Sequence, residues 1–139
     1  MAQQLFPHMS KVNPDEFSPA VWAYIGDAVY ELFVRQHLVS GGPAKTRDLH
    51  KEATTRVRAG YQAELVKRIE PFLTEREQEI VKRGRNVKSG HVPAGSDVIT
   101  YRYSTAFEAL LGYLYLSGET ERLNELLATT YTLNEMGER

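Results

Sequence analysis

The sequence predicts an all-α fold, built as a bundle of helices. Two stretches, residues 20–34 and 103–116, are almost continuously apolar, which is typical of helices in the middle of a domain. Around them, apolar residues recur at helical spacing, and no run alternates convincingly in the manner of a strand. A chain of 139 residues and 15.8 kDa is expected to form one domain, residues 1–139, with a sizeable core.

The first central helix is expected to begin at Pro19 and to continue to Val39. Ser18 is a favourable N-cap, and proline fits the first helical position because its missing N–H would be unpaired there in any residue. Gly41 and the glycine after it end the helix, and Pro43 prevents its continuation.

Amphipathic helices are expected between the two central ones. One opens near Thr46, and Gly60 either interrupts it or marks a close contact before the helical run ends ahead of Pro71. Thr74 and Glu77 have the spacing of a capping box, which predicts the start of another helix.

The last third of the chain begins with a loop over residues 86–100. A loop of about fifteen residues is long enough to be functional or mobile. The second central helix is then expected over residues 101–117, and a last amphipathic helix over residues 119–132.

The composition excludes several classes of site. The chain has no cysteine, so disulfides, thiolate zinc sites and cysteine nucleophiles are excluded. Its start does not resemble a signal peptide, and no window approaches the ~18–20 apolar residues of a membrane span, so we expect a cytoplasmic protein. The four histidines lack metal-ligand spacing and are expected at the surface or in packing; they are His8, His37, His50 and His91.

The net charge of −1 is distributed unevenly. Residues 82–105 carry a net charge of +4, which leaves −5 for the rest of the chain. A local positive segment on a mildly acidic body favours contact with nucleic-acid phosphates, although a solvated charge run is the more usual explanation of such a pattern. The basic residues of this segment are Lys82, Arg83, Arg85, Lys88 and Arg102.

Each central helix carries carboxylates on an otherwise apolar surface. Asp27 and Glu31 are spaced i, i+4 on one face, and Gly26 beside them suggests the close approach of another helix or of a ligand. Glu108 lies in the middle of the second helix, where an unpaired charge would be costly. An ordinary core helix with an acidic stripe explains the first pattern alone. The two together favour a Mg²⁺ site built from two helix faces.

Three segments resemble the ribonuclease III family. Residues 24–29 (YIGDAV) resemble its signature, residues 81–86 (VKRGRN) its basic turn, and residues 105–112 (TAFEALLG) its second catalytic segment. The short chain is similar to the Mini-ribonuclease III branch, in which the catalytic domain has no separate double-stranded-RNA-binding domain. Full-length members have further carboxylates where this chain has Ala20, Ala23 and Thr105, so the number of metal ions per site stays open.

The resemblance implies an endoribonuclease that cleaves double-stranded RNA, with precursor 23S ribosomal RNA as its substrate. Asp27 and Glu108 would be the catalytic residues and would bind Mg²⁺. The protein would be a homodimer in which Tyr24 inserts into the partner subunit, although packing within its own subunit is the alternative for this residue. A large-subunit ribosomal protein is a further expected partner. The competing hypothesis is a non-catalytic helical module for RNA binding or dimerisation.

Overall fold

The computed structural model describes residue 6, residues 11–87 and residues 97–137, with the backbone alone for residues 133–137. Over this part of the chain there are six α-helices, two short 3₁₀ helices and no β-strand, which confirms the all-α prediction. The elements are η1 (Pro14–Glu16), α1 (Pro19–Val39), α2 (Thr46–Val57), α3 (Ala59–Ile69), η2 (Glu70–Phe72), α4 (Glu75–Arg85), α5 (Val98–Leu116) and α6 (Thr120–Gly137).

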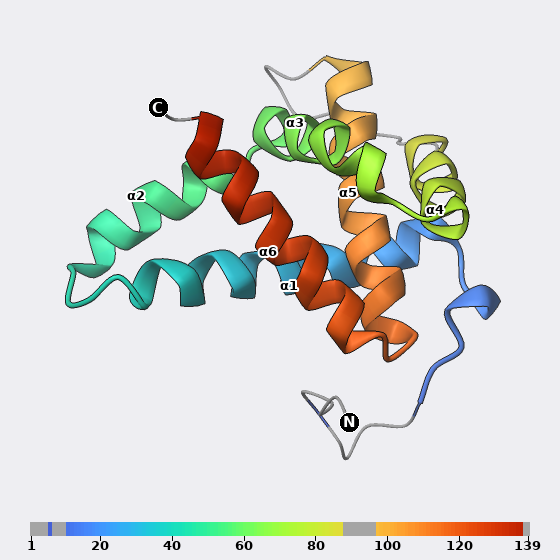
Figure 1. Cartoon of the computed structure of the whole chain (residues 1–139), viewed down its shortest axis with the longest axis horizontal. Coiled ribbons are helices and arrows are strands. Elements are labelled where there is room, and N and C mark those ends of the chain that lie inside the picture. Colours follow the sequence, from blue (N-terminus) through green and yellow to red (C-terminus); the bar gives the residue numbers. More distant parts are fainter. Residues whose placement is uncertain (1–5, 7–10, 88–96, 138–139) are drawn as a thin grey trace.

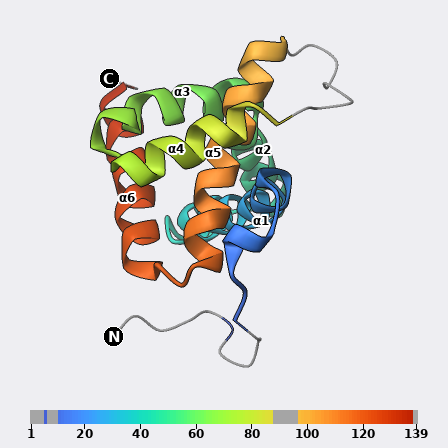
Figure 2. The same cartoon turned by 90° about the vertical axis from the view of Figure 1, so that its right-hand side faces the viewer.

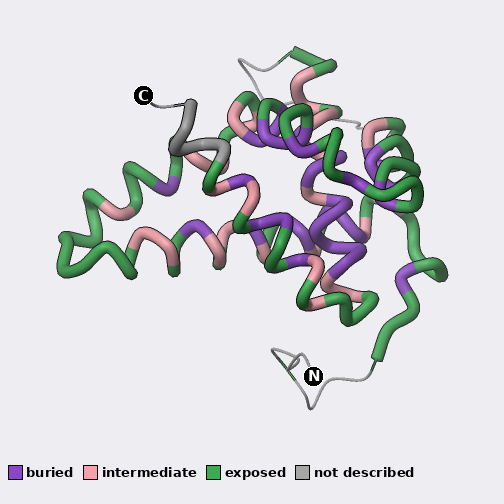
Figure 3. Tube along the Cα trace, viewed as in Figure 1, coloured by how far each residue is buried: buried purple, intermediate pink, exposed green. Residues whose placement is uncertain are grey.

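Helix α5 lies at the centre of the bundle. Helices α1, α3, α4 and α6 all pack against it, and the interface with α1 is the most extensive. In Figures 1 and 2, α1 crosses α5 steeply while the other three helices lie around it. The second half of α1 projects from the bundle together with α2. Figure 3 shows that α5 is largely buried and α2 largely exposed.

The crossing of α1 and α5 depends on two glycines. A Cβ atom added at Gly26 would collide with the carbonyl oxygen of Glu108, and one added at Gly112 would collide with the carbonyl oxygen of Trp22. Each added Cβ would also lie 2.9 Å from the backbone nitrogen of the other glycine. The two helix backbones are therefore in direct contact, at a distance that any side chain would prevent.

Trp22 anchors the start of α1 next to this crossing. Its side chain is fully buried, and its indole Nε1 donates a hydrogen bond of 2.7 Å to the carbonyl oxygen of Pro14. The edge of its ring system meets Tyr113 of α5, with 4.8 Å between the ring centroids. The packing of these two aromatic side chains fixes α1 on α5. The hydrogen bond to Pro14 also holds η1 against the start of α1.

Helix α4 is held by its capping box and by one ion pair. Thr74 and Glu77 exchange the two predicted hydrogen bonds, of 2.9 and 3.1 Å. Both carboxylate oxygens of Glu77 also accept from the guanidinium of Arg122 on α6, at 2.7 and 2.8 Å. The pKa of Glu77 is lowered, chiefly by Arg122, so this buried acid is ionised and compensated.

Several boundaries differ from the sequence-based expectation. Helix α5 begins at Val98, earlier than the expected residue 101, because Asp97 caps it by accepting a 2.8 Å hydrogen bond from the backbone N–H of Thr100. Helix α6 continues to Gly137 instead of ending at residue 132. Most of the expected loop, residues 88–96, lies outside the described residues.

The expectation that α1 is surrounded by protein was wrong. Its Gly26 face packs on α5, but no described element covers the opposite apolar face, where Tyr24 is 78% exposed and Leu32 is 48% exposed. Tyr24 is therefore not part of the core that the described residues form. None of the described helices is long and apolar enough to span a membrane.

Replacing Gly26 with alanine is expected to lower the free energy of unfolding by about 3 kcal/mol or more, the upper end of the usual cost of overpacking a core. The backbones of α1 and α5 have to separate to admit the methyl group. Gly60→Ala is the matched control, because no heavy atom lies within 4 Å of the added Cβ on α3. The control should be neutral or stabilising by up to about 1 kcal/mol. Urea denaturation at one protein concentration measures both, and equal stability of the two variants would contradict the direct crossing.

Candidate active site

Asp27 and Glu108 meet where α1 crosses α5. The carbonyl oxygen of Glu108 is the atom that Gly26 leaves room for, and Asp27 is the next residue along α1. Asp27 is close enough to Glu108 to favour the protonated form of that carboxyl and so to raise its pKa. Asp27 is exposed and Glu108 is partly buried, so the pair lies at the edge of the core and is open to solvent.

Burial and negative charge act on Glu108 together. Burial is the largest cause that raises its pKa, to about 9, followed by the charge and hydrogen bond of Asp27 and a smaller contribution from Glu31. Only the amide of Gln62 opposes the shift appreciably, by favouring the ionised form. Glu77, the other acid inside the bundle, has Arg122 to compensate it. Among the described residues, no basic side chain is one of the main influences on the pKa of Glu108.

Gln62 is the site residue that the sequence analysis missed. It lies on α3, is only 2% exposed, and donates through Nε2 to the carbonyl oxygen of Val57 at 2.8 Å. A signal for it exists in the sequence, because it is a polar residue among the apolar positions that α3 buries. The acidic stripe of α1 was expected, and Glu31 does contribute to the charge at Glu108.

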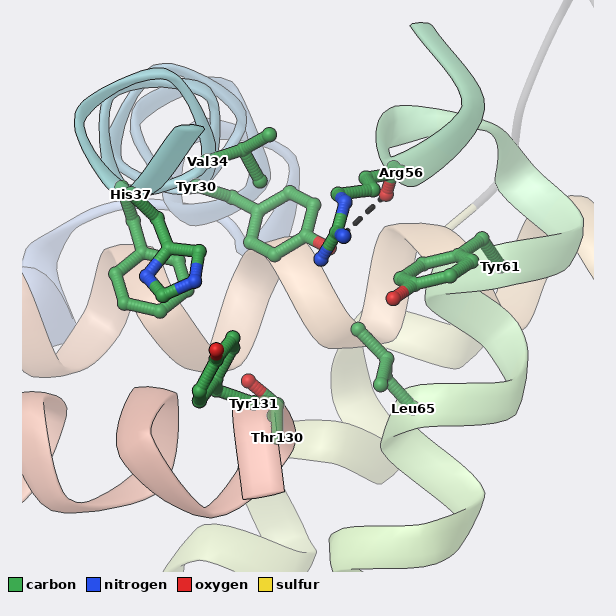
Figure 4. A pocket seen from close by; sticks show the side chains of 9 residues that line it. Tyr30, Val34, His37, Arg56, Tyr61, Leu65, Thr130 and Tyr131 are labelled. Atoms are coloured by element: carbon green, nitrogen blue, oxygen red, sulfur yellow. Dashed lines mark hydrogen bonds between the residues drawn. The ribbon is translucent and has the colours of Figure 1, made fainter. Parts of the chain in front are cut away.

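A hollow lined mainly by aromatic rings lies between α1, α2, α3 and α6 (Figure 4). Tyr30 forms part of its wall and donates a 2.9 Å hydrogen bond to the backbone carbonyl oxygen of Arg56. Burial raises the pKa of Tyr30, which keeps its hydroxyl protonated. The edge of the Tyr30 ring also meets Phe107, with 5.0 Å between centroids, so this residue helps to fix α1 against α5.

The residues predicted to bind RNA have different surroundings. Lys82, Arg83 and Arg102 are exposed, Arg85 is partly buried, and Lys88 lies outside the described residues. The guanidinium of Arg83 packs over the ring of Trp22 at 4.9 Å from its centroid, so this side chain is held in place on the surface of the bundle.

The histidines with described positions are consistent with packing or surface roles. His37 contacts Tyr131 with 4.0 Å between ring centroids, and His50 is exposed. Within residues 11–87 and 97–137, no group of three or more histidine, cysteine, aspartate or glutamate side chains is placed to hold a metal ion.

The Asp27–Glu108 pair nevertheless fits a hard divalent cation. Mg²⁺ takes oxygen ligands and commonly uses only one or two protein carboxylates while keeping several waters. Two neighbouring acids provide such ligands, and the charge of Asp27 is a cause, second to burial, of the raised pKa of Glu108.

A known protein family and its relatives match this chain over most of its length. The model of the ribonuclease III domain matches residues 20–119, which include the whole helix crossing. A Mini-ribonuclease 3 from a Thermoanaerobacter species is 54% identical over 119 residues, covering 86% of this chain and 84% of that protein. The Mini-ribonuclease 3 of Symbiobacterium thermophilum is 45% identical over 130 residues, covering 94% of this chain and 100% of that protein.

A solved structure has the same fold. The crystal structure of a protein from Fusobacterium nucleatum superposes with a TM-score of 0.78 at 30% sequence identity, covering 90% of this chain and 99% of that one. The matching family and its relatives show that the protein is an endoribonuclease that acts on double-stranded RNA. The chain belongs to the ribonuclease III family. Enzymes of this family generally depend on a divalent metal.

In the metal-free protein, the stability that Glu108 contributes is expected to fall as pH rises. Its pKa in the folded state, about 9, is above the ordinary value of 4.5, so the folded state keeps a proton that the unfolded state releases. The contribution is therefore fully present below pH 4.5 and is lost as pH rises through about 9. The slope is at most about 1.4 kcal/mol per pH unit.

Thermal unfolding in EDTA between pH 5 and pH 9 measures this slope. Glu108→Gln should remove it, so the variant gains stability relative to the wild type as pH rises. Glu77→Gln is the control with the opposite sign. The pKa of Glu77 is lowered in the folded state, so removal of this carboxylate should destabilise the protein at neutral pH. Parallel pH profiles for the wild type and Glu108→Gln would show that Glu108 does not retain its proton.

Proposed function

We propose that this endoribonuclease uses Mg²⁺ bound by Asp27 and Glu108, and that it matures precursor 23S ribosomal RNA in the cytoplasm. The pairing of these acids across the Gly26–Gly112 crossing is the observation that supports the site, because two uncompensated carboxylates lie together at the edge of the core. The ribosomal substrate rests on the resemblance to the Mini-ribonuclease III branch. The same proposal treats residues 1–139 as one catalytic unit.

The reaction is hydrolysis of a phosphodiester. A water oxygen attacks the phosphorus and the bond to the 3′ oxygen breaks, which leaves a 5′-phosphate on one product and a 3′-hydroxyl on the other. Bound Mg²⁺ supplies Lewis-acid chemistry at the scissile phosphate. Asp27 and Glu108 act as its oxygen ligands and need not be general bases. Glu108 has to release its proton when the cation binds, because a ligating carboxylate is ionised.

The basic residues would hold the duplex near this site. Double-stranded RNA is recognised largely through its shape and through phosphate and 2′-hydroxyl contacts, which suits arginine and lysine donors. The role in RNA binding is supported most directly for Arg83. Its exposed guanidinium is held by stacking on Trp22, so the side chain would lose little conformational entropy on binding RNA. Lys82, Arg85, Lys88 and Arg102 belong to the same proposed surface.

The proposal includes a homodimer formed by the uncovered apolar face of α1. Tyr24 and Leu32 lie two turns apart on this face, and Ala28 between them is also exposed. A two-fold interface uses the same patch on both subunits, and it would give the duplex two sites, one for each strand. A large-subunit ribosomal protein is proposed as a further partner in cleavage. Like the ribosomal substrate, it rests on the resemblance to the Mini-ribonuclease III branch.

Asp27→Asn and Glu108→Gln are each expected to lower kcat by about 10³-fold or more, since each removes a ligand worth several kcal/mol of transition-state stabilisation. Cleavage of a defined RNA duplex in Mg²⁺ measures kcat, and a gel-shift assay in EDTA should show unchanged duplex binding. Glu121→Gln, which removes an exposed charge from α6, is the control and should remain active. An active Asp27→Asn enzyme would reject the assignment of the site.

Tyr24→Ala is expected to shift the protein from dimer toward monomer at micromolar concentration and to lower cleavage in parallel, because a large apolar anchor is lost from the proposed interface. Light scattering gives the mass. Phe72→Ala removes another exposed aromatic side chain, outside α1, and should leave both mass and activity unchanged. A Tyr24→Ala protein that stays dimeric would place the interface elsewhere.

A further inference from the structure

We propose that Lys67, on α3, is a further residue that binds the phosphates of the RNA duplex. This inference rests on the proposed function, because it extends the surface that would hold the duplex beside the acid pair. Lys67 lies outside the basic segment of residues 82–105, so the RNA surface would be built from α3 as well as from α4 and α5.

The ammonium group of Lys67 is held over an aromatic ring of α5. Its Nζ atom lies 4.8 Å from the centroid of the Tyr103 ring, although Lys67 as a whole is exposed. Attraction between a cation and the face of a ring restricts a long side chain that would otherwise move freely. Lys67 would therefore lose less conformational entropy on binding a phosphate than an unrestrained surface lysine would.

Among the described side chains, no carboxylate neutralises the charge of Lys67. The ion pairs of this part of the chain do not include it. Glu64, one turn earlier on α3, pairs instead with Arg68, with 3.3 Å between Oε1 and Nε. The positive charge of Lys67 therefore remains available to an anion from outside the chain.

The other contacts between cations and rings show that stacking alone does not define such a residue. Arg76 also lies over a tyrosine ring of α5, but its guanidinium donates to Asp15 at 2.7 Å and so links α4 with η1. Arg83, like Lys67, stacks on a ring and has no acid partner among the described side chains. Lys67 and Arg83 therefore share what a phosphate-binding residue needs, a positioned charge that the fold itself does not use.

The contact between Lys67 and Tyr103 lies on the part of α5 that leads to the proposed active site. Helix α3 packs against α5 (Figures 1 and 2). Tyr103 and Glu108 are five residues apart on α5, which is about 7.5 Å along the helix axis. Arg102, next to Tyr103, is exposed and belongs to the proposed RNA surface. Lys67 therefore adds a second charge beside this end of α5.

The test compares Lys67→Gln and Lys67→Arg with the wild type. Glutamine removes the charge, whereas arginine keeps both the charge and the ability to stack on Tyr103. Lys51→Gln is the matched control, because Lys51 is also exposed but lies on α2 and stacks on no ring among the described residues. The affinity for a defined RNA duplex is measured in EDTA between about 50 and 200 mM KCl. Values of kcat and KM are measured in Mg²⁺.

A phosphate contact predicts that Lys67→Gln binds the duplex about threefold to tenfold more weakly. The slope of log affinity against log salt concentration should become shallower by about 1. KM should rise by a similar factor with kcat unchanged, because such a contact stabilises the ground state and the transition state equally. Lys67→Arg and Lys51→Gln should both keep wild-type affinity and slope.

Wild-type affinity and salt slope in Lys67→Gln would overturn the inference. An equal loss in Lys51→Gln would also overturn it, because removal of any surface charge would then have the same effect. Neither result bears on the proposed function, which the kcat of Asp27→Asn tests separately in the same assay.

Discussion

The direct contact between the backbones at Gly26 and Gly112 is the constraint on which the rest of this structure depends. No side chain fits between α1 and α5 at this point, so the two helices cross at the closest distance that their main chains allow. The contact fixes the position along each helix, because sliding by one residue would place a side chain in the gap. Asp27 follows Gly26 directly, and Glu108 precedes Gly112 by one helical turn, so the same contact determines where the acids meet.

Two glutamates in the helix bundle have opposite electrostatic surroundings: the pKa of Glu77 is lowered and that of Glu108 is raised. Arg122 keeps Glu77 ionised, and Glu77 accepts bonds from Arg122 on α6 and from the backbone N–H of Thr74, the N-cap of α4, so its charge connects two elements and is compensated. Glu108 is only partly buried and lies near Asp27; its pKa is raised, and no basic side chain is among the main influences on it in the described part of the chain. The first arrangement stabilises the fold as it stands. The second arrangement favours a bound proton, and it would also favour the cation that is proposed to bind there.

Features set by neighbouring residues could be predicted from the sequence, and features set by distant ones could not. Thr74 and Glu77 were predicted as a capping box because both partners lie within one turn, and Gly26 was flagged as a close approach because glycine weakens a helix. The hydrogen bonds from Arg122 to Glu77 join residues far apart in the chain, so nothing in the local pattern indicates them. The spacing of apolar residues in α1 also does not show whether another helix covers Tyr24, because that depends on how the helices pack.

Helix α1 links the fold with both the proposed chemistry and the proposed dimer interface. One face carries Gly26 and contacts α5, an adjacent one carries Asp27, and a third exposes Tyr24. Tyr24 and Asp27 are three residues apart on one continuous helix, so a partner that bound Tyr24 would be rigidly connected to the acid pair. A substitution that tilted α1 to improve one of these contacts would displace the others. The backbone contact at Gly26 leaves almost no freedom for such a tilt. We infer that this contact keeps the acid pair and the proposed dimer interface at fixed positions relative to each other.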